Sequence, residues 1–476
     1  MAGSRGAKKW FRILGRVRVR PYFSLREEEG GGQGVERSRL IFLGLDGVGL
    51  DLAAGLARRG VMPRLGRLLE AGAAWATASP LPEVSPVCWT TMFSGADPGD
   101  HGVFGFGEHI PGSYQVRPVD AGAVRVPRLW DRLGLLGRRS VVLNVPLTYP
   151  AAPLEGLMVS GFVAPELSRA VHPPGLLARL KAHGYRPEAD LDQGRDDPAA
   201  FIADQARALA ARLALFGELL DEPWDLYAAV FTDTDRVNHF LWPALSDDAH
   251  PLAGAAREVY ARIDGFIGLV LERFAPELES GGLKLLIAAD HSFGPIRSEV
   301  YLNPWLIEMG YLKTEGPPGA ERILPETTAL ALDPGRIYLH RAGRFPRGRP
   351  LGDAQALGLL EGIRSGLKSL RFKRITREGC GICVVEDAPM AQVRLGRELY
   401  QGPRAAQGPD LVATPAPGYS LRAGLGRGSV FGQSHLTGTH QPAGALALMW
   451  PPLPPEQRPD TVRGLFGLMA VALGLS

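Results

Sequence analysis

Short runs of consecutive apolar residues, separated by segments with helical spacing, constrain the fold of this chain most. The first run, at 40–45, is apolar at every position but one glycine and ends at Asp46. Such a run is typical of a strand buried on both faces, as in a parallel sheet. The same reading predicts strands at 140–144, 157–160, 226–231, 283–289 and 445–449, and helices at 63–70, 127–136, 198–220, 255–274 and 461–473. This alternation predicts an α/β fold with a large, mostly parallel central sheet flanked by helices.

The alternation of predicted strands and helices changes between residues 301 and 427, where proline and glycine divide the chain into shorter segments. Strands are expected here at 336–339 and 382–385. At 476 residues the chain exceeds the usual size of a single domain, which favours one large domain with insertions or two domains. We therefore predict one main domain at 39–476 in which 301–427 contains a smaller embedded subdomain.

Residues 1–38 differ from the rest in charge. A flexible, solvated tail is the expectation, and a basic helix that contacts a membrane surface or a partner is the alternative. The basic residues that come before any acidic one are Arg5, Lys8, Lys9, Arg12, Arg16, Arg18, Arg20 and Arg26.

Composition excludes several classes of protein. The 53 basic residues nearly balance the 50 acidic ones, so no nucleic-acid partner is expected. Three cysteines are too few for a disulfide framework, and the pair Cys380 and Cys383 lacks the second pair of a zinc site. No apolar run has the length of a membrane span or a signal-peptide core. A cytoplasmic protein is the expectation.

The stretch from Val84 to Gly95 presents one hydroxyl, that of Ser85, at the predicted start of a helix. Proline at the first helical position has a fixed φ and no amide to leave unpaired, so Pro86 is expected there with Ser85 before it. Taken alone, Ser85 is a capping residue. The alternative is a nucleophile, because the positive end of the helix dipole favours an alkoxide and the anion that it attacks.

Acidic residues and histidines gather where the predicted strands end. In parallel sheets the ligand site lies beyond the carboxyl ends of the strands, so one site would collect these side chains. Mixed carboxylate and imidazole ligands suit Zn²⁺ or Mn²⁺ better than Ca²⁺. Two such ions would activate the Ser85 hydroxyl, which is otherwise a poor nucleophile at neutral pH. The candidate ligands are Asp46, Asp235, His239, Asp290, His291 and His440.

Five spaced motifs give a resemblance to a known family. The motifs are Leu43-Gly44-Leu45-Asp46-Gly47, the Ser85 stretch that ends in His101-Gly102, Asp235-x-x-x-His239, Asp290-His291 and Gly438-x-His440. Their order is similar to that of the alkaline phosphatase superfamily and, more closely, of the type I phosphodiesterase/nucleotide pyrophosphatase family. The resemblance runs from about residue 40 to residue 449.

The resemblance implies that 39–476 is an alkaline-phosphatase-like catalytic domain and that 301–427 contains its embedded cap subdomain. It also implies two metal ions and a covalent phosphoserine that is then hydrolysed. Phosphodiester or pyrophosphate bonds of a small phosphate ester would be the substrates. Two divalent cations, Zn²⁺ by preference and Mn²⁺ otherwise, would be the cofactors. One would be held by Asp46, Asp290 and His291 with Ser85, and the other by Asp235, His239 and His440.

Two positions depart from the family pattern. Ser85 stands where the better-known members have threonine, an exchange that keeps the hydroxyl. Phe106 stands where those members have a phosphate-contacting asparagine, and a phenyl ring cannot donate a hydrogen bond. Phe104, Phe106 and Trp89 either line a pocket or pack into the core, and packing is predicted.

Rival functions remain beside the phosphodiesterase reading. The nearest are a phosphomonoesterase and a transferase similar to phosphoglycerate mutase, although the mutase's large inserted domain is not recognisable here. A sulfatase is disfavoured because the residues after Ser85 do not match a formylglycine precursor. Membrane-bound phosphoethanolamine transferases are disfavoured by the lack of membrane-spanning runs. A catalytically silent metal-binding scaffold is the remaining alternative, and intact ligands and nucleophile argue against it.

Overall fold

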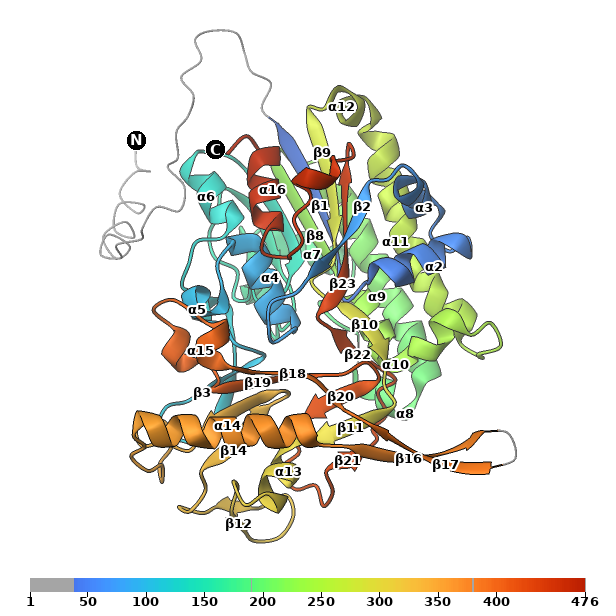
Figure 1. Cartoon of the computed structure of the whole chain (residues 1–476). Coiled ribbons are helices and arrows are strands. Elements are labelled where there is room, and N and C mark those ends of the chain that lie inside the picture. The colour runs from blue at the N-terminus through green and yellow to red at the C-terminus, as the bar shows by residue number, and fades with distance from the viewer. Residues whose placement is uncertain (1–37, 190, 379–380, 476) are drawn as a thin grey trace.

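The computed structural model describes residues 38–189, 191–378 and 381–475. The predicted tail at 1–38 and Cys380 therefore lie almost wholly outside the described residues. The predicted fold class is confirmed: a large central sheet lies between two layers of helices, with a second, smaller layer beneath it (Figure 1). The order of the central sheet is β2 (Ala74–Ala78), β23 (Ala443–Trp450), β9 (Leu283–Ala288), β1 (Arg39–Leu45), β8 (Leu226–Phe231), β5 (Ser140–Val145), β6 (Gly156–Ser160) and β7 (Val171–His172).

The middle of this sheet is parallel and its edges are antiparallel. Strands β9, β1, β8, β5 and β6 all run in one direction. Strand β23 pairs antiparallel with β9 and with β2, and β7 pairs antiparallel with β6. The start of β23 therefore lies at the same edge of the sheet as the carboxyl ends of its parallel neighbours.

Successive residues of β1 point to opposite faces of the sheet and enter different cores. Ile41, Leu43 and Leu45 belong to the larger core, whereas Leu40 and Phe42 belong to the core on the other face. Since both faces are covered, the strand reads as a continuous apolar run rather than an alternating one.

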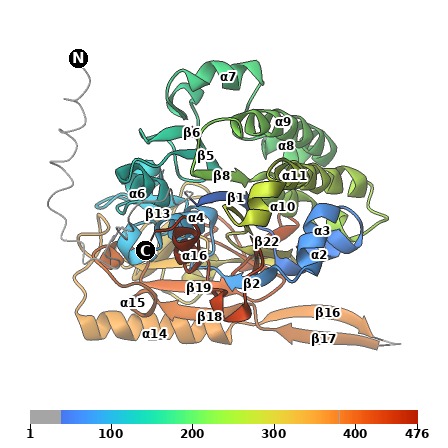
Figure 2. The ribbon, with the colours of Figure 1, turned by 90° about the horizontal axis from the view of Figure 1, so that it is seen from above.

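Helices cover both faces of the sheet, as Figure 2 shows from above. On the face of the smaller core lie α4 (Ser85–Ser94), α6 (Leu129–Leu135) and α16 (Leu465–Ala472). On the other face lie α2 (Leu50–Arg58), α3 (Pro63–Glu70), α7 (Leu176–Ala182), α8 (Leu191–Asp196), α9 (Pro198–Leu219), α10 (Asp233–Ser246), α11 (Ala253–Arg273) and α12 (Ala275–Ser280).

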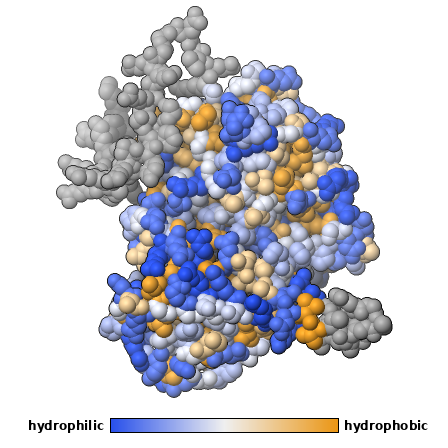
Figure 3. All heavy atoms as spheres, viewed as in Figure 1, coloured by the Kyte–Doolittle hydropathy of each residue, from blue (hydrophilic) through white to orange (hydrophobic). Residues whose placement is uncertain are grey.

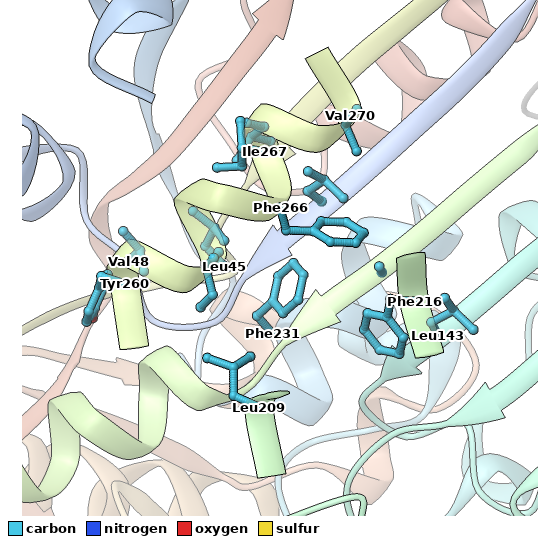
Figure 4. Close-up of a cluster of buried hydrophobic side chains, with 14 of the residues drawn as sticks. Leu45, Val48, Leu143, Leu209, Phe216, Phe231, Tyr260, Phe266, Ile267 and Val270 are labelled. Carbon is cyan, nitrogen blue, oxygen red and sulfur yellow. The ribbon is translucent and has the colours of Figure 1, made fainter. Parts of the chain in front are cut away.

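The larger core joins these helices to the sheet (Figure 4). The rings of Phe231 on β8 and Phe266 on α11 meet edge to face with their centroids 5.6 Å apart, and Phe216 on α9 lies 5.8 Å from Phe231. All three side chains are almost fully buried. Each such ring contributes about 1.5–3 kcal/mol by leaving water, so this packing fixes the helices against the sheet.

The second layer lies below the carboxyl edge of the sheet and has a core of its own (Figure 1). Its centre is a sheet in the order β14 (Ala329–Asp333), β15 (Arg336–Leu339), β19 (Leu411–Pro415) and β18 (Met390–Leu395), covered by α14 (Asp353–Ser369) and α13 (Leu302–Glu308). A hairpin of β16 (Phe372–Glu378) and β17 (Gly381–Asp387) projects from it.

The remaining strands and α-helices are short. They are α5 (Pro98–His101), β3 (Gly107–His109), β4 (Val116–Pro118), β10 (Ser292–Pro295), β11 (Ser298–Tyr301), β12 (Thr314–Glu315), β13 (Arg322–Ile323), α15 (Gly396–Leu399), β20 (Tyr419–Arg422), β21 (Phe431–Gly432) and β22 (Gly438–Gln441).

Among the described residues, no helix combines the length and apolar character that crossing a membrane requires. On the face shown in Figure 3, apolar residues lie in small groups among polar ones.

Candidate metal centre and nucleophile

The six predicted ligands lie at the carboxyl edge of the sheet in two groups of three. Within each group the candidate ligand atoms lie within 4.8 Å of one another. Asp46 directly follows β1, and Asp290 comes shortly after β9. Asp235 lies in the first turn of α10, which follows β8. The groups are Asp46, Asp290 and His291, here the first metal group, and Asp235, His239 and His440, here the second metal group.

His440 reaches this edge because the strand that follows it is antiparallel. It lies on β22, which pairs with β10 so that His440 stands opposite Phe293. Its ring stacks on that of His291 with the centroids 3.8 Å apart. This stacking contact places the two metal groups side by side.

One carboxylate in each group, Asp290 in the first and Asp235 in the second, has one oxygen hydrogen-bonded to the protein and the other without a hydrogen-bond partner. Oδ1 of Asp290 accepts a hydrogen bond from the backbone N–H of Gly47 at 3.2 Å, and Oδ2 of Asp235 accepts one from Arg236 at 2.6 Å. Oδ2 of Asp290 and Oδ1 of Asp235 are buried and have no hydrogen-bond partner. A buried oxygen without a donor costs about 1–3 kcal/mol or more, and a bound cation removes this cost.

Each histidine uses Nδ1 on a backbone carbonyl, which can only accept. Nε2 of a neutral ring is then a bare lone pair directed at the centre, the arrangement that metal-binding histidines have. His239 Nε2 and His440 Nε2 lie 3.1 Å apart. Because two lone pairs at this distance repel each other, the pair needs a proton or a cation between the two nitrogens. The carbonyl partners are Gly438 for His239 at 3.0 Å, Ser292 for His291 at 3.2 Å and Glu83 for His440 at 2.8 Å.

The titration of these groups reflects a buried centre with excess negative charge. Burial raises the pKa of Asp290 to about 7, and burial with the charge of Asp290 raises that of Asp46. Burial lowers the pKa of His239 to about 4. Burial also lowers the pKa of His440, but the neighbouring Asp235 outweighs it and the net shift is upward.

Ser85 faces the first metal group. Its Oγ lies 3.4 Å from Oδ1 of Asp46 and 3.5 Å from Nε2 of His291, and the side chain is buried. The helix begins one residue earlier than predicted: Val84 is the cap, Ser85 the first helical residue and Pro86 the second. No side chain caps this helix, so the Ser85 hydroxyl turns to the metal group rather than to the backbone of its own first turn.

One turn further along α4, Trp89 holds Asp46. Its Nε1 donates to Oδ2 of Asp46 at 3.0 Å, while its fully buried ring packs in the smaller core. Phe104 is also buried and meets the ring of Tyr400 at 5.0 Å. The predicted packing is thus confirmed for both residues. Phe106 is only half-buried, and its ring meets that of Phe162 at 6.0 Å.

Two residues without a predicted role support the centre, one by direct contact and one through the first. Arg236 contacts Asp235, and Glu188 contacts Arg236 at 3.0 Å. The sequence does contain a signal for Arg236. A cation in the first turn of a helix is disfavoured by the helix dipole, so another interaction must stabilise it there. Glu188 lies in a loop with no recognisable pattern. His435, near His440 in the sequence, is exposed and stacks on Phe240 away from both groups.

The family follows from a comparison of the sequence with family models. Residues 40–349 match the model of the type I phosphodiesterase/nucleotide pyrophosphatase family. The chain belongs to this family. Its members hydrolyse phosphate esters, which agrees with the sequence resemblance. No curated protein matches the chain.

Several solved structures have folds similar to that of this chain. Phosphonoacetate hydrolase from Sinorhizobium meliloti 1021, solved with phosphonoformate, is 15% identical with a TM-score of 0.61, covering 92% of this chain and 96% of that one. Human ectonucleotide pyrophosphatase/phosphodiesterase 5 is 13% identical with a TM-score of 0.53, covering 92% and 95%. The murine form, inactive and solved with AMP, is 12% identical with a TM-score of 0.53, covering 92% and 96%. These likenesses show that this phosphodiesterase family member has their fold.

Proposed function

We propose that this family member is a two-metal hydrolase that cleaves phosphodiester or pyrophosphate bonds with Ser85 as its nucleophile. The observation that carries the proposal is the position of the Ser85 hydroxyl. It contacts the first metal group at Asp46 and His291, and His291 stacks on His440 of the second metal group. A single hydroxyl thus lies beside a pair of sites whose unpaired oxygens and imidazole nitrogens fit divalent cations.

The residues that would hold the cations are the six of the two metal groups, with Ser85 joining the first. Zn²⁺ fits this mixture of imidazole and carboxylate ligands, and Mn²⁺ is the second choice. Bound there, the ions supply Lewis acidity that lowers the pKa of a hydroxyl and neutralises charge on a phosphoryl group.

The chain's own contribution begins at Ser85. As its Oγ bonds to phosphorus, its proton passes to solvent and the bond from phosphorus to the leaving oxygen breaks. The leaving group departs with the bonding electrons and gains a proton. Water then bonds to phosphorus as Ser85 Oγ leaves, which restores the enzyme. The N-terminal end of α4 favours the negative charge that develops at Ser85.

The second layer is proposed as the cap, which corresponds to the expected insertion at 301–427. It lies across the carboxyl edge of the sheet, where both metal groups are (Figure 1). The rings of Phe106 and Phe162 contact each other, and the centre of the Phe162 ring lies 4.4 Å from the guanidinium of Arg236 beside the second metal group. Such an aromatic wall suits an apolar or aromatic leaving group on the phosphate.

The test is hydrolysis by the purified full chain with Zn²⁺ or Mn²⁺. Bis-p-nitrophenyl phosphate, p-nitrophenyl phosphate and phosphonoacetate distinguish diester, monoester and phosphonate cleavage. We expect the diester to be preferred, Ser85→Ala to lose activity and Ser85→Thr to retain it. His440→Ala should lose activity while the matched variant His435→Ala keeps it. No hydrolysis of any substrate by a folded, metal-loaded protein would refute the proposal.

A further inference from the structure

Arg236 is a buried cation at a position that disfavours one. It lies in the first turn of α10, where the helix dipole is positive, and its guanidinium packs 4.4 Å from the centre of the Phe162 ring. It donates to Oδ2 of Asp235 at 2.6 Å. A buried guanidinium in this place needs a second anion to balance its charge, because Asp235 is also a candidate ligand of the second metal group.

Glu188 is that anion. Its Oε2 accepts from Nε of Arg236 at 3.0 Å and its Oε1 from Nη2 at 3.4 Å, a two-point pairing of the kind that orients arginine. Oε1 also accepts from the hydroxyl of Thr232 at 3.4 Å. Glu188 comes from the loop between α7 and α8, so the pair joins this loop to the start of α10.

The other carboxylates at the centre are held by neutral donors. Trp89 Nε1 holds Asp46 and the backbone N–H of Gly47 holds Asp290. Only Asp235 is held by a full positive charge. An unbalanced guanidinium so close to a metal ligand would repel a divalent cation, and Glu188 cancels that charge.

We propose that Arg236 and Glu188 are positioning residues for the second metal group. Arg236 ties Oδ2 of Asp235 and so turns Oδ1 to the cation, and Glu188 holds Arg236 in place and neutralises it. The inference rests on the proposed two-metal function. It predicts that both residues act on one metal position and leave the other unchanged.

The experiment measures Zn²⁺ affinity by competition with a chelating dye, using the full chain after metal removal. The wild type should bind two ions. Arg236→Gln should weaken one of them by about 10–100-fold, the usual effect of removing such a partner. Asp290→Asn, which weakens the first metal group, provides the background in which the second position is measured alone. Trp89→Phe is the matched control, because it should weaken the position of Asp46 instead.

A double-mutant cycle tests whether Glu188 acts through Arg236. Glu188→Gln alone should weaken the second position about tenfold or more. In the Arg236→Gln background the same change should weaken it less than twofold. Arg236→Lys should restore part of the affinity, since it keeps a donor and a charge for both carboxylates.

The outcomes separate this inference from the proposed function. A wild type that binds no Zn²⁺, or that binds it equally well after His440→Ala, refutes the two-metal function. A wild type with two ions whose affinities change less than twofold in Arg236→Gln overturns the positioning role alone. An equal effect of Glu188→Gln in both backgrounds also overturns it. So does a kcat/KM loss in Arg236→Gln at saturating Zn²⁺ with unchanged affinity, which indicates direct substrate contact.

Discussion

His101 gives a prediction about the pH dependence of stability. Its side chain is fully buried beside α4, where Nδ1 accepts from the backbone N–H of Val103 at 3.1 Å. Nε2 therefore carries the proton and donates to the hydroxyl of Thr91 at 3.0 Å. A second proton on the ring would break the contact with Val103. Burial lowers the pKa of His101 from its ordinary 6.5 to about 3.

The direction in which pH changes the free energy of unfolding follows from proton binding to His101. Between pH 6.5 and pH 3 the unfolded chain holds a proton on this ring and the folded chain does not. The free energy of unfolding is thus unaffected by His101 above pH 6.5 and falls as the pH is lowered toward 3. The slope is about 1.4 kcal/mol per pH unit, so the loss between pH 7 and pH 5 is about 2 kcal/mol.

The assay is urea unfolding of wild type and His101→Gln at pH 7 and pH 5, followed by circular dichroism. Glutamine does not titrate and keeps an amide donor for Thr91, so the variant should lose about 2 kcal/mol less than wild type on acidification. His435→Gln, at an exposed histidine whose pKa is also lowered by partial burial, is the control and should differ from wild type less than His101→Gln does. Equal losses of the free energy of unfolding in wild type and His101→Gln would contradict the prediction. They would show that the His101 ring is protonated in the folded state or that water reaches it there.

Three further predictions concern the core and the metal centre. Gly44→Ala should lower the free energy of unfolding by about 1–3 kcal/mol in denaturant titrations, because its Cβ would lie 2.6 Å from the ring of Trp89. Arg212→Met should cost about 3–5 kcal/mol by the same measurement, because it leaves the buried carboxylate of Asp233 without its ion-pair partner. Zn²⁺ affinity, measured by dye competition, should fall as the pH drops below about 7, where protons compete for Asp290. A flat profile from pH 8 to pH 5 would contradict this.

The central sheet could be predicted because its strands are buried on both faces. The runs at 40–45 and 226–231 have no polar residue to break them, and the structure forms β1 and β8 there. The antiparallel direction of β23 could not be predicted, since an apolar run does not indicate which way a strand is paired. That direction is nevertheless what brings His440, before the strand, to the carboxyl edge.

The grouping of five candidate ligands could be predicted from the strands that they follow, and His440 could be added only through the family resemblance. The contacts that hold these ligands in place could not be predicted. Trp89 lies one helical turn from Ser85, so its approach to Asp46 depends on how α4 packs on β1. Glu188 is 48 residues from Arg236 and lies in a loop. Contacts of this kind come from tertiary packing, which local sequence patterns do not encode.

The antiparallel last strand also decides when the metal centre can exist during synthesis. Asp46 leaves the ribosome roughly 400 residues before His440, an interval of about 20–80 s at ordinary rates of translation. In the later part of this time Asp235 and His239 are present without their third ligand, and β9 lacks the neighbour that covers its edge. In the proposed two-metal enzyme, cation binding at the second metal group would therefore be among the last events of biogenesis, and occupancy of that position would report that the whole sheet has closed.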